Sequence, residues 1–146
     1  MGTLLIVRHG ETEWNAEGRI QGHTDIGLSE KGAEQARSLG QRLADRQIDV
    51  AYSSDLKRTS ETAKLALGGR DITLNETPRL REYNKGIFEG MTLSEIQEKF
   101  PAEYPKYLEK DLSYAPEGGE TTRDVSTRMA SIFAEIKANH LDETVL

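Results

Sequence analysis

The chain has 146 residues, of which 36% are hydrophobic and 30% charged, a composition typical of one soluble globular domain. Its net charge is −6 at pH 7, so no general basic field favours nucleic acid or an anionic membrane surface as a partner. The lack of cysteine excludes disulfides, thiolate metal sites and thiol catalysis, and it fits a reducing cytoplasm.

The first predicted element is a strand over residues 3–7. This run is continuously apolar and β-branched, a pattern that favours a central parallel strand covered on both faces. It is too short to span a membrane, and Gly10 ends it. Arg8 and His9 are therefore expected at the carboxyl end of the strand.

Alternating helices and strands are predicted next. Apolar residues at helical spacing predict a helix over residues 29–46, with Ser29 as its N-cap. Residues 48–53 are expected to form a strand, and Ser54 or Asp55 to cap a helix that follows it. A third strand is expected over residues 71–74.

The second half begins with an irregular stretch, residues 75–90, and continues with Thr92 and Glu95, a capping-box pair that starts a short helix. A long helix is predicted from Thr122 to Asn139, with one apolar stripe, and residues 143–146 begin another strand. This alternation predicts a single α/β domain over residues 1–146, with a three-layer α/β/α arrangement and a mainly parallel sheet.

The step Arg8-His9-Gly10 is the first candidate for chemistry. In α/β folds, ligands bind beyond the carboxyl ends of parallel strands, and a glycine there lets a ligand approach the backbone closely. By itself the tripeptide is more often an ordinary surface turn.

Its context is more specific. Segments around this step and further along the chain together resemble the signature of the histidine phosphatase superfamily, whose fold is phosphoglycerate-mutase-like. They are Arg8-His9-Gly10-Glu11-Thr12, Trp14-Asn15, Gly18-Arg19, Gln21-Gly22, Asp25, Leu28-Ser29, Gly32, Ser53-Ser54-Asp55-Leu56, Arg58-Thr59, Thr62-Ala63, Leu80-Arg81-Glu82, Glu89-Gly90, Pro116 and Gly118-Gly119-Glu120.

The resemblance implies a phosphomonoesterase that works through a phosphohistidine on His9. Arg8 and Arg58 match the arginine clamp, and guanidinium forks neutralise phosphoryl oxygens better than lysines do. Asn15 matches an amide that contacts the phosphate. Glu82 matches the general acid, which must protonate the leaving alkoxide.

Other polar and aromatic residues have smaller expected roles. Gln21 and Gly22 are expected beside the substrate, and Tyr83 on its leaving-group side. His23 borders the family's active site without matching a catalytic position. His140 ends the long helix, where capping is the expected role.

The resemblance also implies a second catalytic histidine, in a Ser/Thr-His-Gly step after the strand that begins near Glu143. We expect the 146-residue chain to be cut before that step. We also expect it to be inactive or nearly so, because lost oxyanion stabilisation costs roughly 10²- to 10³-fold in rate.

Two alternatives to hydrolysis remain. Phosphoglycerate mutases, which are isomerases, share these motifs but carry a longer middle segment with substrate-binding arginines, whereas no arginine occurs here between Arg81 and Arg123. A catalytically silent phosphate-binding protein on the same fold is the other. We expect no metal and no cofactor, a small phosphorylated substrate, no nucleic-acid or membrane partner and a cytoplasmic location. Homo-oligomerisation stays open.

Overall fold

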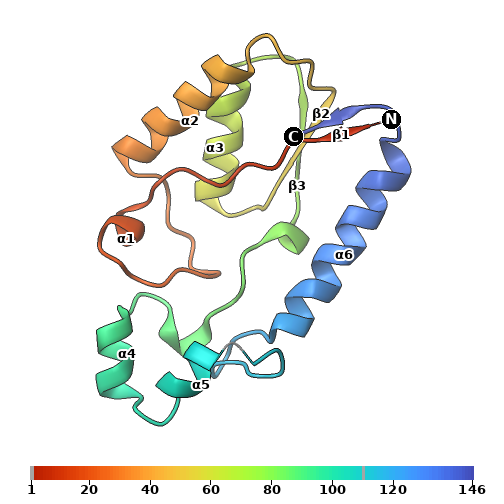
Figure 1. Cartoon of the computed structure of the whole chain (residues 1–146). Helices are drawn as coiled ribbons and strands as arrows, with labels where there is room; N and C mark the ends of the chain where they lie inside the picture. The colour runs from red at the N-terminus through yellow and green to blue at the C-terminus, as the bar shows by residue number, and fades with distance from the viewer. Residues whose placement is uncertain (1, 110) are drawn as a thin grey trace.

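The computed structural model describes residues 2–109 and 111–146 and contains one four-stranded parallel sheet (Figure 1). The strand order is β1-β4-β2-β3, with β1 at Thr3–Leu4, β4 at Thr144–Val145, β2 at Val50–Ser53 and β3 at Thr73–Glu76. All three strand pairs are parallel, which confirms the predicted α/β class.

Helices cover both faces of the sheet around β2. The long helix α6, Thr122–Asn139, buries Ile132 and Ile136 against Val50 of β2 and Val145 of β4. The paired helices α2, Glu30–Leu43, and α3, Lys57–Leu67, lie on the other side of the sheet (Figure 1). The three-layer arrangement is therefore present, because β2 is buried on both faces and α6 turns an apolar stripe of period 3.6 toward it.

The prediction for residues 3–7 was wrong in its extent and its burial. Only Thr3 and Leu4 form β1, which pairs with β4 alone among the described residues, and Ile6 is 80% exposed. Its apolar side chains line one wall of a groove of about 220 Å³ that extends to His9. An apolar run indicates that burial of its side chains is favourable, but it does not specify which helices or strands of the fold bury them.

The predicted caps are correct in two helices and wrong in one. Ser29 caps α2 through the N–H of Gly32, and Thr92 with Glu95 forms a capping box on α4, Leu93–Lys99. Helix α3 instead has Leu56 at its N-cap, with no capping bond from that side chain. Its first free N–H, at Lys57, donates to Asp25 from a loop 32 residues earlier, at 2.7 Å.

The stretch after β3 contains two short 3₁₀ helices, η1 at Pro78–Leu80 and η2 at Gly86–Phe88, and α5 follows α4 at Tyr104–Glu109. Phe88 is fully buried and packs edge-on against Phe100 and Tyr107, which gives this half a small core of its own. A one-turn helix, α1 at Glu13–Ala16, follows His9. Within the described residues, no helix is long and apolar enough to cross a membrane.

Candidate active site

Three predicted site residues follow three different strands and meet at the carboxyl edge of the sheet. His9 follows β1, Arg58 lies in the first turn of α3 after β2, and Glu82 follows β3. The charges of Arg58 and Glu82 both act on the His9 ring. The parallel sheet thus brings together an imidazole, a guanidinium and a carboxylate from distant parts of the sequence.

The geometry of His9 fixes which ring nitrogen carries the proton. Its Nδ1 lies 2.6 Å from the carbonyl oxygen of Gly10, and a carbonyl can only accept, so Nδ1–H is the donor. Burial lowers the pKa of His9 below its usual value, and the cations Arg58 and Arg8 lower it further, against the opposing effects of the Gly10 bond and Glu82. A neutral imidazole with a lone pair on Nε2 is the form that can attack phosphorus.

The backbone beside His9 is held by α2 and α3. The N–H of Gly10 donates to Thr62 Oγ1 at 3.0 Å, and the Thr62 hydroxyl donates to the carbonyl of Arg58 at 2.6 Å. A Cβ atom on Gly10 would lie 2.4 Å from the carbonyl oxygen of Gly32. The structure therefore gives Gly10 a packing role against the start of α2, which differs from the ligand approach that we expected.

Arg58 is a buried cation, and one of its three nitrogens has no hydrogen-bond partner in the described structure. Its side chain is 1% exposed, and its two terminal nitrogens donate to the carbonyls of Gly22, at 2.7 Å, and Thr24, at 3.1 Å. One of them also lies 3.5 Å from Glu82 Oε2, a long contact for a charged pair. The Nε–H is buried without a partner in the described structure, a costly arrangement that an anionic ligand would relieve.

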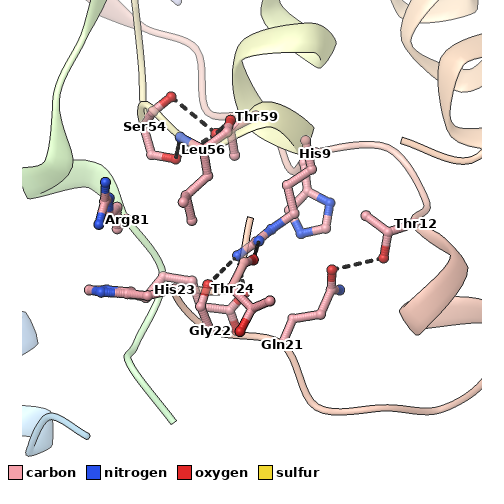
Figure 2. A network of polar contacts seen from close by, with 12 residues as sticks. His9, Thr12, Gln21, Gly22, His23, Thr24, Ser54, Leu56, Thr59 and Arg81 are labelled. Carbon is pink, nitrogen blue, oxygen red and sulfur yellow. Dashed lines mark hydrogen bonds and ion pairs between the residues drawn. The ribbon is translucent and has the colours of Figure 1, made fainter. Parts of the chain in front are cut away.

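The remaining predicted phosphate contacts differ in how firmly they are held. Arg8 has an exposed side chain. Asn15 is fixed by α1, because its Oδ1 accepts from both the N–H and the hydroxyl of Thr12 at 3.1 Å. Thr12, which is fully buried, also donates to Gln21 Oε1 at 2.8 Å, and Figure 2 shows this pair close to His9.

The loop from Gly22 to Thr24 is anchored by a carboxylate that sequence reasoning gave no role. Glu89 accepts hydrogen bonds from the N–H groups of His23, Thr24 and Lys85 and from the Thr24 hydroxyl. Burial would raise the pKa of Glu89, but these bonds outweigh it and the pKa is lowered. The anchored loop, visible in Figure 2, presents the two carbonyls that hold Arg58.

A second set of contacts positions the backbone of Glu82. Arg128 of α6 donates to the carbonyls of Glu82, at 2.8 Å, and Arg81, at 2.5 Å, and it pairs with Glu120 at 2.8 Å. His23 Nε2 lies 3.0 Å from the Glu82 carbonyl oxygen, so this histidine also helps to position the backbone of Glu82. The Glu82 side chain itself stays about half exposed.

Tyr83 directly follows Glu82, and its role on the leaving-group side of a substrate stays a prediction. Its hydroxyl donates to the carbonyl of Tyr114 at 3.2 Å, which fixes the ring, and the Lys85 ammonium lies 3.7 Å from the ring centroid. His140, by contrast, lies outside this site, where it ends α6 and contacts Tyr52 and Glu143.

Sequence reasoning missed several positioning residues. Thr12, Thr62, Glu89 and Glu120 all occur within the matched motifs, which was the available signal, although the motif alone does not indicate what each side chain contacts. Arg128 lies outside them and has the spacing of an ordinary solvated helix residue.

Comparison with known proteins agrees with this geometry. The sequence profile of the histidine phosphatase superfamily (branch 1) matches residues 4–146. The chain belongs to this superfamily. Phosphoserine phosphatase 1 of Hydrogenobacter thermophilus is 36% identical over 146 residues, which is all of this chain and 69% of the relative.

Other members of the histidine phosphatase superfamily are similarly close. The 2,3-bisphosphoglycerate-dependent phosphoglycerate mutase of Bartonella henselae is 34% identical over 87% of this chain and 64% of the mutase. The solved structure of Bacillus stearothermophilus YhfR superposes with a TM-score of 0.92 at 40% identity, covering all of this chain and 72% of that one. The chain thus spans about two thirds of the length of the relatives it matches.

Proposed function

We propose that the protein hydrolyses phosphate monoesters through a phosphohistidine on His9. The observation that carries this proposal is the pairing of a neutral imidazole, with Nε2 as its lone-pair nitrogen, and the buried Arg58, whose Nε–H has no partner in the described structure. A phosphoryl group between them would supply the missing acceptor.

The reaction would run in two displacements. Nε2 of His9 attacks phosphorus, the P–N bond forms as the ester P–O bond breaks, and Arg58 and Arg8 neutralise the phosphoryl oxygens. Glu82 would give its proton to the leaving alkoxide and then take one from the water that attacks the phosphohistidine. Phosphate leaves and His9 returns to its neutral form.

Hydrolysis is preferred to phosphoryl isomerisation on charge grounds, although phosphatases and mutases both occur among the relatives. A mutase must hold a bisphosphorylated intermediate, and it must exclude water from the site while that intermediate reorients. The segment from Arg81 to Arg123 supplies no further arginine for this purpose.

The test is a trapping experiment on the full-length protein. After a brief reaction with p-nitrophenyl phosphate and an alkaline quench, mass spectrometry should find one phosphoryl group on His9. The variant H9A should lose the adduct and at least about 10³-fold in hydrolysis. As the matched control, H140Q changes a histidine outside the site and should retain both.

Two results would reject the proposal. Interconversion of phosphoglycerates without phosphate release would favour a mutase. Phosphate binding that leaves no adduct on His9 would favour a silent binding protein.

A further inference from the structure

A single carboxylate lies between the phosphate side and the acid side of the site. Glu89 Oε1 accepts from the backbone N–H of His23 at 2.8 Å and from that of Lys85 at 3.0 Å. Its Oε2 accepts from the backbone N–H of Thr24 at 2.7 Å and also from the Thr24 hydroxyl. One side chain thus joins the loop around His23 to the segment that follows Glu82.

Gly22 leaves the space that this carboxylate occupies. A Cβ atom at Gly22 would lie 2.0 Å from Glu89 Oε1 and 2.8 Å from the backbone nitrogen of Lys85. Because these distances are far inside van der Waals contact, any side chain at position 22 would displace the carboxylate. Gly22, which we expected beside the substrate, therefore also has a packing role against Glu89.

The hydrogen bonds of Glu89 argue against its acting as a proton donor in the reaction. A carboxylate has about four lone-pair sites, and the N–H and O–H groups around Glu89 already occupy them. Burial opposes ionisation of Glu89, but these bonds outweigh it and lower the pKa. Glu82, by contrast, keeps a carboxylate that is about half exposed. We therefore expect Glu89 to act on the reaction through the groups that it holds.

The loop that this carboxylate holds, drawn in Figure 2, contacts both sides of the site. The carbonyls of Gly22 and Thr24 accept from the terminal nitrogens of Arg58, at 2.7 and 3.1 Å, and so orient the guanidinium and its Nε–H. The imidazole of His23 lies 3.0 Å from the carbonyl oxygen of Glu82. A shift of this short loop would therefore move the proposed phosphate-binding cation relative to the proposed acid.

We propose that Glu89 is a positioning residue that holds Arg58 and Glu82 in a fixed relative position, so that phosphate binding and protonation of the leaving oxygen occur in one geometry. The inference rests on the proposed function, because it assumes those roles for Arg58 and Glu82. A small displacement is enough to matter, since misplacing a reacting group by about 1 Å can cost about 10²-fold in rate.

The test compares E89Q with the unaltered full-length enzyme. Glutamine keeps the shape of the side chain, but its NH₂ group points donors at N–H groups that need an acceptor. We expect kcat/KM for p-nitrophenyl phosphate to fall about 10²-fold, and that for phenyl phosphate to fall several-fold further. Phenyl phosphate lacks the nitro group, so its leaving oxygen is more basic and depends more on protonation by Glu82.

Binding of inorganic phosphate, measured by calorimetry, gives a second readout with a sign of its own. Removing a negative charge near the site would by itself strengthen anion binding. If Glu89 positions Arg58, E89Q should instead bind phosphate about tenfold more weakly. This readout needs no turnover. It still decides whether Glu89 positions Arg58 if no adduct forms on His9 and the proposed function fails.

Three further variants separate positioning from general damage, each measured where denaturant unfolding shows it to be folded. G22A leaves Glu89 in the chain but displaces its carboxylate, and it should reproduce both effects. E89D keeps the charge on a shorter side chain and should recover part of each. E98Q changes an exposed glutamate of α4 and should match the unaltered enzyme.

Two outcomes in folded E89Q would overturn the inference. Equal losses for the two esters would show that Glu82 keeps its place without Glu89. A phosphate affinity that is unchanged or higher would show the same for Arg58. If E89Q and G22A both fail to fold, E89D takes their place, with smaller losses of the same pattern expected.

Discussion

At the scale of single residues, the properties of His9 depend on its neighbours more than on its own chemistry. Its Nδ1 proton is held by the adjacent carbonyl of Gly10, and two arginines and burial favour the neutral ring. The same arginines that would bind a phosphoryl group therefore also keep the imidazole in its nucleophilic form.

The first prediction concerns the titration of His9. NMR of the ring nitrogens should give a midpoint below 6.5, and R58Q should move it upward because one depressing charge is lost. R37Q, at an exposed position of α2, should leave it in place. A midpoint above 6.5 in the unaltered protein would contradict the electrostatic account.

The sign of this shift also has a consequence for stability. The unfolded chain protonates His9 at a higher pH than the folded one does. The contribution of His9 to the free energy of unfolding is thus fully present above pH 6.5 and is lost as the pH falls below it.

At the scale of elements, α3 shows how a helix can be started from outside its own segment. No side chain at its N-cap bonds to its free N–H groups, and Asp25 accepts from Lys57 at 2.7 Å. Because Arg58 is the next residue, the same contact fixes the first turn that carries the buried guanidinium.

The second prediction follows from this remote cap. D25A should lower the free energy of unfolding by about 0.5–2 kcal/mol, the usual cost of a lost cap, measured by denaturant unfolding. Amide exchange should rise first at Lys57 and its neighbours. D71A removes an exposed aspartate elsewhere and serves as the control. If both variants have the same stability, the contact is no cap.

At the scale of the whole molecule, Arg128 joins α6 to the segment that carries Glu82. Its guanidinium reaches the carbonyls of Arg79, Arg81 and Glu82 as well as the carboxylate of Glu120. Among the described backbone hydrogen bonds, none joins a strand of the sheet to residues 81–90, which follow η1. The position of the proposed acid is thus coupled to the packing of the long helix.

The third prediction tests that coupling. R128M should cost roughly 2–4 kcal/mol of stability, because it strands several carbonyls and a paired carboxylate. It should also slow formation of the phosphohistidine at temperatures where the fold persists. R123M, at an exposed position on the same helix, should affect neither measurement. Normal phosphorylation in a destabilised R128M would show that Arg128 supports the fold without positioning Glu82.

The sequence by itself determined the elements and the candidate reactants. The apolar side chains of Ile48, Val50 and Ala51, which are buried in or just before β2, and the period-3.6 stripe in α6 reflect how much of each element is covered, a property that neighbouring residues encode. The sequence also predicted that His9 follows an apolar run within a recognisable motif, and it predicted the helix caps at Ser29 and Thr92.

Only the tertiary structure decided how those reactants are held. The bonds of Asp25 to Lys57, Thr62 to Gly10, and Glu89 to the loop at His23 link residues 32, 52 and 66 positions apart. Such contacts depend on which strands lie side by side in the sheet. Local sterics and periodicity do not specify that strand order, because each helix or strand can form the same backbone pattern in several topologies.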